Sequence, residues 1–197
     1  MLAKANLKLE FILSGNSYLF KQAPRWHQHD FGAQRHLAPQ LQSWLQETGS
    51  LTKRLRQIHA EKFAVKLLFE GWHHAYIDEA LILEQPKSQF LWVREVLLHS
   101  NNQGLVLART VLPKATIATA QRKLSHLGSR PLGEVIFAYP DLKLCQRQFC
   151  KINQASWSKA GLAAIEPDAE IWGRRTVYAI HSQPLLVAEF FLPNSYA

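Results

Sequence analysis

Two segments of this chain have the pattern of β-hairpins, and each carries charged residues inside strands that are otherwise apolar. Each consists of two apolar runs separated by a short stretch of turn-forming residues. The paired runs are 90–98 with 105–113, joined by residues 101–104, and 171–180 with 185–193, joined by residues 181–184. Strands joined by tight turns pair antiparallel, so these segments constrain the fold to one built on an antiparallel sheet.

The first hairpin carries two arginines. If residues 101–104 close the turn symmetrically, Arg94 lies opposite Val111 and Arg109 opposite Val96. Both arginines then share one face as diagonal neighbours, roughly 7–8 Å apart. Guanidinium groups suit a carboxylate or phosphate ligand. The alternatives are neutralisation by carboxylates such as Glu95, although Glu95 is expected on the opposite face, or a bulge that turns one arginine to solvent.

The second hairpin places a carboxylate among apolar side chains. With Ser182 and Gln183 at its tip, Glu189 lies opposite Thr176 and diagonal to Arg174. One interpretation is an ion pair with Arg174 inside the sheet. The other is a hydrogen-bond acceptor or proton carrier for a substrate hydroxyl. The sequence leaves both open.

The rest of the chain favours one α+β domain over residues 1–197. Residues 1–36 are expected to form an extended arm, because they lack periodicity. Helical spacing of apolar residues, capping residues and the alternation of apolar with polar residues predict the other helices and strands. They are a helix after Pro39, a second helix capped by Ser50, a strand over 62–70, a helix over 115–127, a strand over 142–152 and a polar stretch over 153–168.

Composition narrows the function classes. Two cysteines, Cys145 and Cys150, indicate neither a disulfide framework nor a zinc site, and no signal or membrane segment is expected. We therefore expect a reduced, cytoplasmic protein. The net charge of +8 comes from scattered Lys and Arg residues without a nucleic-acid-binding motif, so no nucleic-acid partner is expected. His27, His29, Asp30 and His36 could bind a metal ion, but a surface segment is favoured.

Six ordered motifs give the chain a family resemblance over roughly residues 37–195. They are Ser50-Leu-Thr-Lys-Arg54, Trp92-Val-Arg-Glu-Val-Leu-Leu98, Ala108-Arg-Thr-Val-Leu-Pro113, Leu127-Gly-Ser-Arg-Pro-Leu-Gly133, Ile171-Trp-Gly-Arg-Arg175 and Pro184-Leu-Leu-Val-Ala-Glu-Phe-Phe-Leu-Pro193. In this order they resemble chorismate lyase, the enzyme that starts ubiquinone synthesis in bacteria. The ordered set is far more specific than any single motif.

The resemblance implies cleavage of chorismate to 4-hydroxybenzoate and pyruvate without cofactor or metal, in a closed pocket on the sheet. It implies that Arg94 binds the ring carboxylate and that the backbone amides of Leu51 and Leu132 assist. Leu51 stands where the family has a methionine, which a backbone donor tolerates. Glu189 faces the ring hydroxyl, and Arg109 lies near the enolpyruvyl carboxylate.

The resemblance also sets expectations for partners. Chorismate is the expected substrate, the protein is expected to be a monomer, and transient contact with a membrane-bound prenyltransferase is a hypothesis based on basic charge and pathway order. The alternative function is a non-catalytic module that binds or senses 4-hydroxybenzoate or a similar aromatic acid, since effector domains of some transcription regulators resemble the same fold.

Overall fold

The computed structural model describes residues 17–28, 36–59, 62–120, 124–125, 127–163, 165 and 169–196. Its centre is a six-stranded antiparallel sheet in the order β1-β2-β3-β6-β5-β4. The α+β class and the antiparallel sheet are as predicted. The strands are β1 (Phe63–His74), β2 (Phe90–Ser100), β3 (Gln103–Leu112), β4 (Lys143–Ile152), β5 (Ile171–Ile180) and β6 (Gln183–Phe191).

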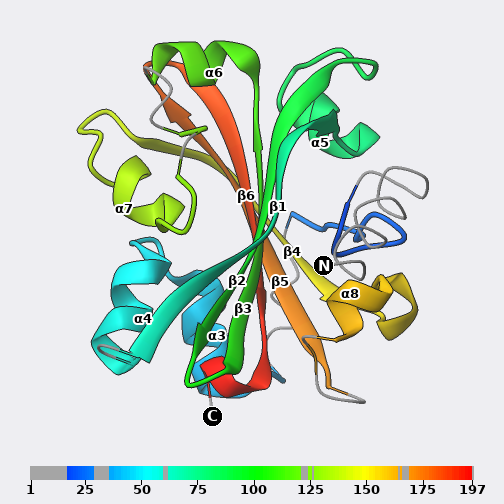
Figure 1. The fold of residues 1–197 in the computed structure, drawn as a ribbon, viewed down its shortest axis with the longest axis vertical. Coiled ribbons are helices and arrows are strands. Elements are labelled where there is room, and N and C mark those ends of the chain that lie inside the picture. The colour runs from blue at the N-terminus through cyan, green and yellow to red at the C-terminus, as the bar shows by residue number, and fades with distance from the viewer. Residues whose placement is uncertain are drawn as a thin grey trace, which may run out of the picture.

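Short helices cover both faces of the sheet. Figure 1 shows α4 and α7 on one side and α5 and α8 on the other. The helices are α3 (Pro39–Gln46), α4 (Leu51–His59), α5 (Ile77–Ile82), α6 (Lys114–Thr119), α7 (Leu132–Ile136) and α8 (Lys159–Leu162), with 3₁₀ turns at Gln154–Ser156 and Pro193–Ser195. Helices α3 and α4 begin where predicted, whereas α5 was not anticipated. Of the predicted 115–127 helix, the described residues form α6 over Lys114–Thr119.

The first hairpin has a different register from the predicted one. Its turn is tight, with Asn101 and Asn102 both at positive φ, and β3 then has a bulge at the step from Leu98 to His99 of β2. Arg94 therefore pairs with Thr110, and Arg109 pairs with Glu95. A slip of one residue moves side chains to the other face. The prediction that the two arginines lie side by side on one face is therefore wrong.

The second hairpin keeps the predicted face. His181 and Ser182 form its turn, both at positive φ, so Glu189 pairs directly with Arg174 instead of Thr176. This register differs from the predicted one by two residues. Because side chains alternate with a period of two, Glu189 still points to the face that carries Arg174 and Thr176.

The core divides between the two faces of the sheet. On one face, Leu45 of α3 and Leu55 of α4 pack over Val96 of β2. On the other, Leu19 and Phe20, from the segment predicted as an extended arm, are buried against the sheet. Part of that arm is thus packed into the core, whereas Arg25 and His27 in the same segment are exposed.

Within the described residues, no helix has the length and apolar character needed to cross a membrane.

Candidate active site

A small enclosed pocket lies between the sheet and helices α4 and α7. Its volume is about 40 Å³, which is roughly the space of a single water molecule. Apolar side chains form its middle, and Arg94 and Glu189 are its charged residues. The lining residues are Gly49, Leu51, Thr52, Arg94, Val96, Leu98, Ala108, Thr110, Pro131, Leu132, Gly133, Ile136, Phe137, Tyr178, Val187 and Glu189. Four of the five predicted site residues are brought together here.

Arg94 is buried, with a side chain 2% exposed. Its Nη2 donates to the carbonyl oxygens of Gly128 and Arg130, at 2.9 and 3.0 Å. Gly128 has a φ of +54°, a conformation that favours glycine, so the sequence of this turn suits the contact. Nε lies 3.4 Å from Oε1 of Glu70, but within the described residues it has no hydrogen-bond acceptor.

The charge of Arg94 is therefore held mainly by neutral groups. Burial lowers the pKa of Arg94, and the nearby charge of Glu70 opposes this effect. A buried donor without an acceptor is rare in folded proteins and often marks a functional position. The position of Nε suits an anionic ligand that accepts from it, and a guanidinium group can hold a carboxylate with two parallel hydrogen bonds.

The cover of the pocket is formed by the starts of two helices. Ser50 caps α4 as predicted, since its Oγ accepts from the backbone N–H of Lys53 at 3.3 Å. Leu51 and Leu132 are the first residues of α4 and α7, and N–H groups in the first turn have no partner within the helix. A Cβ at Gly133 would lie 3.0 Å from Ser50 Oγ, so glycine permits this close approach of α7 to α4.

Glu189 approaches the pocket from β6. Its Oε2 accepts from Nε of Arg174 at 2.6 Å, and its side chain is 12% exposed. Arg174 is itself buried, and its Nη1 donates to the carbonyl oxygens of Trp44 and Glu47 at the end of α3. The ion pair predicted as one alternative is present. It leaves Oε1 of Glu189 without a hydrogen bond to a described residue.

Arg109 lies on the opposite face, away from this pocket. Nε and Nη2 donate to both carboxylate oxygens of Glu79 on α5, each at 2.8 Å, and Nη1 donates to Glu95 at 2.8 Å. Its side chain is 1% exposed. Carboxylates thus neutralise Arg109, so we assign it no contact with a ligand in the pocket. The carboxylate alternative considered for the arginines applies to Arg109, with Glu95 on its own face.

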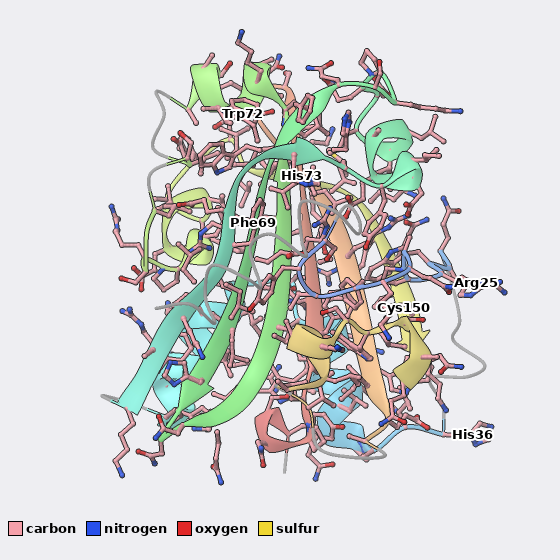
Figure 2. The ribbon with its side chains drawn as sticks, turned by 45° about the vertical axis from the view of Figure 1, so that its right-hand side comes forward. Arg25, His36, Phe69, Trp72, His73 and Cys150 are labelled. Atoms are coloured by element: carbon pink, nitrogen blue, oxygen red, sulfur yellow. The ribbon has the colours of Figure 1, made fainter. Side chains whose placement is uncertain are left out.

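A second, wider groove lies beside β4. Its volume is about 670 Å³, and Arg25, His27, His36 and Lys151 line it. Figure 2 places Arg25 and His36 at the surface on the β4 side of the molecule. No group of three or more His, Cys, Asp or Glu side chains within the described residues is arranged to hold a metal ion. His29 and Asp30, which were considered as metal ligands, lie outside the described residues.

Sequence reasoning missed three polar residues around the pocket. Thr110 lines it opposite Arg94, and Tyr178 lines it near Glu189. Burial is the main cause that raises the pKa of Tyr178, and the charge of Glu189 adds to it. Arg147 of β4 lies behind Tyr178, opposite Thr176. Only the register of the whole sheet reveals these positions, because they come from strands that are distant in sequence.

The fold and the site together define a class of protein. It is an α+β domain with a small pocket, lined by a buried arginine, between one face of an antiparallel sheet and the starts of two helices. A family model described as chorismate lyase matches residues 21–197, and the chain belongs to this family.

Relatives agree with this assignment over most of the chain. A probable chorismate pyruvate-lyase of Methylococcus capsulatus is 42% identical over 153 residues, covering 78% of this chain and 94% of the relative. A chorismate pyruvate-lyase of Hamiltonella defensa is 33% identical over 154 residues, covering 77% of each chain.

Solved structures share the fold at low sequence identity. PhnF from Mycobacterium smegmatis has a TM-score of 0.55 at 12% identity, covering 77% of this chain and 67% of that one. The ligand-binding domain of a putative GntR-family transcriptional regulator from Bordetella bronchiseptica has a TM-score of 0.51 at 15% identity, covering 70% and 90%. These similarities concern the fold alone.

Proposed function

We propose that this protein cleaves chorismate to 4-hydroxybenzoate and pyruvate, the first committed step of ubiquinone synthesis. Family membership supports this reaction, and the single observation that carries it to this chain is Arg94. This buried arginine lines an enclosed pocket with Nε free of hydrogen bonds to described residues, and Glu189 lines the same pocket. Chorismate has a ring carboxylate and a ring hydroxyl, which these two residues would bind.

The spacing of the two residues suits a ring held lengthwise. Arg94 is on β2 and Glu189 on β6, with β3 between them. Two strand spacings amount to about 10 Å, and both side chains line the pocket between them. The apolar side chains of Val96 and Ala108, which line the pocket between Arg94 and Glu189, would contact the ring. The binding site would then hold a carboxylate at one end and a hydroxyl at the other.

The reaction itself is an elimination that makes the ring aromatic. The bond between the ring and the ether oxygen breaks, and the hydroxyl-bearing ring carbon loses its proton. The enolpyruvyl fragment gains a proton at its methylene carbon as it becomes pyruvate. The protein's task is to orient the substrate and stabilise the charge that moves onto the leaving group.

Each site residue has a role in this proposal. Arg94 anchors the ring carboxylate, assisted by the backbone N–H groups of Leu51 and Leu132. Glu189, held at Oε2 by Arg174, uses Oε1 to accept from the ring hydroxyl or to assist proton transfer. Because Arg109 is enclosed by carboxylates on the other face, the proposal gives it no role in binding.

The size of the pocket implies movement during the reaction. A volume of about 40 Å³ holds no aromatic ring, so α4 and α7 must separate to admit the substrate. An open groove of about 510 Å³ lies outside them, and it shares Gly133 and Phe137 with the pocket. Release of a buried product through the same opening would be slow, so we expect product inhibition.

The test is a direct assay of metal-free protein with chorismate. Formation of 4-hydroxybenzoate and pyruvate in equal amounts, faster than the spontaneous reaction, is the expected result. The fold's similarity to a regulator's ligand-binding domain favours a second candidate, a non-catalytic module that binds 4-hydroxybenzoate. Tight binding of 4-hydroxybenzoate without turnover would support that candidate and overturn the first.

The proposal extends to location and partners. A cytoplasmic, monomeric protein with transient contact to a membrane-bound prenyltransferase fits the family's pathway and the net charge of +8. Sedimentation would test the oligomeric state. If the protein showed no salt-sensitive binding to anionic vesicles, the contact with a membrane partner would lose its physical basis.

A further inference from the structure

The pocket face of the sheet carries more positive than negative charge. Arg94 is within ion-pair distance of Glu70, and Arg174 pairs with Glu189. A third arginine, Arg147 of β4, shares this face, yet no described carboxylate lies within ion-pair distance of it. One positive charge on this face, on a half-buried side chain, is thus left without a carboxylate among the residues that the structure describes.

Neutral groups fix the position of Arg147. Its Nε donates to Oγ1 of Thr176 at 3.1 Å, and its Nη1 donates to the carbonyl oxygen of Gln46 at 3.3 Å. Its third nitrogen, Nη2, is buried and finds no acceptor within the described part of the chain. This arrangement parallels that of Arg94, whose guanidinium group is also held by carbonyl oxygens and also has one buried nitrogen without an acceptor.

The surroundings of Arg147 connect it to the pocket. Burial lowers the pKa of Arg147 most, and the neighbouring charge of Arg174 lowers it further. The neighbouring groups Tyr178 and Glu189 act on its pKa in the opposite direction through their charge. Tyr178 and Glu189 both line the pocket, and Arg147 does not line it but pairs with Thr176, two residues from Tyr178 on β5.

We propose that Arg147 binds the second carboxylate of a dianionic substrate at the Glu189 end of the pocket. This inference rests on the function proposed above, since chorismate has two carboxylates and Arg94 accounts for only one. Arg109 cannot serve the other, because it lies on the opposite face between Glu79 and Glu95. Nη2 is covered in the structure, so the enolpyruvyl carboxylate reaches it only after the widening that a ring already requires.

The proposal makes Arg147 selective between substrate and product. Chorismate has the enolpyruvyl carboxylate, and 4-hydroxybenzoate lacks it. Arg147→Gln should therefore lower kcat/KM for chorismate about 10- to 100-fold, the range expected for a hydrogen bond to a charged group. The Kd of 4-hydroxybenzoate, measured by calorimetry, should change by less than about 2-fold.

Two further variants complete the experiment. Arg147→Lys keeps the charge but not the planar guanidinium group. Its kcat/KM for chorismate should therefore fall less than in Arg147→Gln, and the Kd of 4-hydroxybenzoate should again change little. Lys143→Gln removes one positive charge from an exposed position of the same strand and should change neither quantity. If Arg147→Gln does not fold, Arg147→Lys provides the same comparison of chorismate with 4-hydroxybenzoate.

Each result has a definite meaning. Equal losses for chorismate and 4-hydroxybenzoate would reduce Arg147 to a structural support for α3 and Thr176 and overturn the inference. Unchanged chorismate kinetics in Arg147→Gln, with an active parent protein, would overturn this inference and leave the proposed function standing. A parent protein without turnover of chorismate would remove the proposed function and the inference with it.

Discussion

The two faces of the sheet each bury an arginine from the first hairpin, but they treat its charge differently. On the face covered by α5, Arg109 is enclosed by the carboxylates of Glu79 and Glu95 and all three of its nitrogens donate. On the face covered by α4 and α7, Arg94 donates to two backbone carbonyl oxygens, and its Nε lacks an acceptor among the described residues. Both side chains are almost fully buried.

From this difference we infer that Arg109 has a structural role and that Arg94 is the arginine that binds the ligand. A buried arginine that is matched by carboxylates ties strands to a helix and has no positive charge left for a ligand. Arg94 has one carboxylate oxygen, from Glu70, at 3.4 Å from its Nε and otherwise donates to backbone carbonyl oxygens, so its charge is less fully matched and is available to an anion that enters later. Burial alone therefore identifies neither role, and the identity of the acceptors decides between them.

The comparison of the two faces predicts that replacing Arg109 has the largest effect, and that this effect is on stability. Arg109→Gln leaves Glu79 and Glu95 buried without their counter-charge, so the free energy of unfolding should fall by about 3–5 kcal/mol. Urea denaturation measures this loss. Arg94→Gln serves as the matched control on the other face and should lose much less. Equal destabilisation of the two variants would contradict the proposed difference between the faces.

The next effect is on ligand binding at Arg94. Arg94→Gln should weaken the binding of 4-hydroxybenzoate, and lower kcat/KM for chorismate, about 100-fold, because it removes a charged double hydrogen bond worth about 3 kcal/mol. Calorimetry and the chorismate assay measure the two quantities. Lys66→Gln, at an exposed position of β1, is the control for a change in net charge. Full turnover and affinity in Arg94→Gln would refute the assignment.

A smaller effect is expected at Glu189. The parent protein should bind 4-hydroxybenzoate about 10-fold more tightly than benzoate, because Oε1 accepts from the hydroxyl. Glu189→Gln should reduce this preference, while the binding of benzoate changes little. Competition assays with both ligands measure the ratio. If the parent protein bound the two acids equally well, Glu189 would have no role at the hydroxyl.

The smallest effect concerns the loop between α3 and α4 that lines the pocket. The hydrogen bond from the Gly49 N–H lowers the pKa of Glu47, burial opposes this, and the charge of Arg54 lowers it further. A lowered pKa in the folded state means that the carboxylate stabilises the fold above its ordinary pKa of 4.5. This stabilisation is lost as the pH falls through the lower folded value.

Glu47→Gln should therefore reduce the free energy of unfolding by less than about 1 kcal/mol at pH 7, and the difference should disappear at an acidic pH below the lowered pKa of Glu47. Urea denaturation at the two pH values measures it. Glu84→Gln, at an exposed position just after α5, is the control for removing a surface carboxylate. If the difference in the free energy of unfolding between the parent protein and Glu47→Gln increased at acidic pH, the predicted direction of the pH dependence would be wrong.

The sequence predicted the second hairpin's face correctly and the first hairpin's face incorrectly, for one physical reason. In the second hairpin the true register differs by two residues, which preserves alternation, so Glu189 stays on the pocket face. In the first, a tight turn at Asn101 and Asn102 combines with a bulge in β3, and the net slip of one residue moves Arg109 to the other face. The types of residue in the turn at 101–104 did not predict the bulge that follows it in β3.

Other parts of the site depend on contacts between distant segments. The motifs around Arg94, Leu51, Leu132 and Glu189 could be grouped from the sequence, and the structure places all four in one pocket. Arg147 could not be found in this way, because its place follows from the pairing of β4 with β5 and from the end of α3. The small volume of the pocket likewise depends on how closely α7 approaches α4.

A crystal structure with 4-hydroxybenzoate bound would test most directly the claim that the face that carries Arg94 is the ligand-binding face. The account predicts the carboxylate within hydrogen-bond distance of Arg94 Nε, the hydroxyl directed at Glu189, and the ion pairs of Arg109 unchanged. A ligand bound on the α5 side against Arg109, or in the Arg94 pocket with its carboxylate away from Arg94, would contradict it.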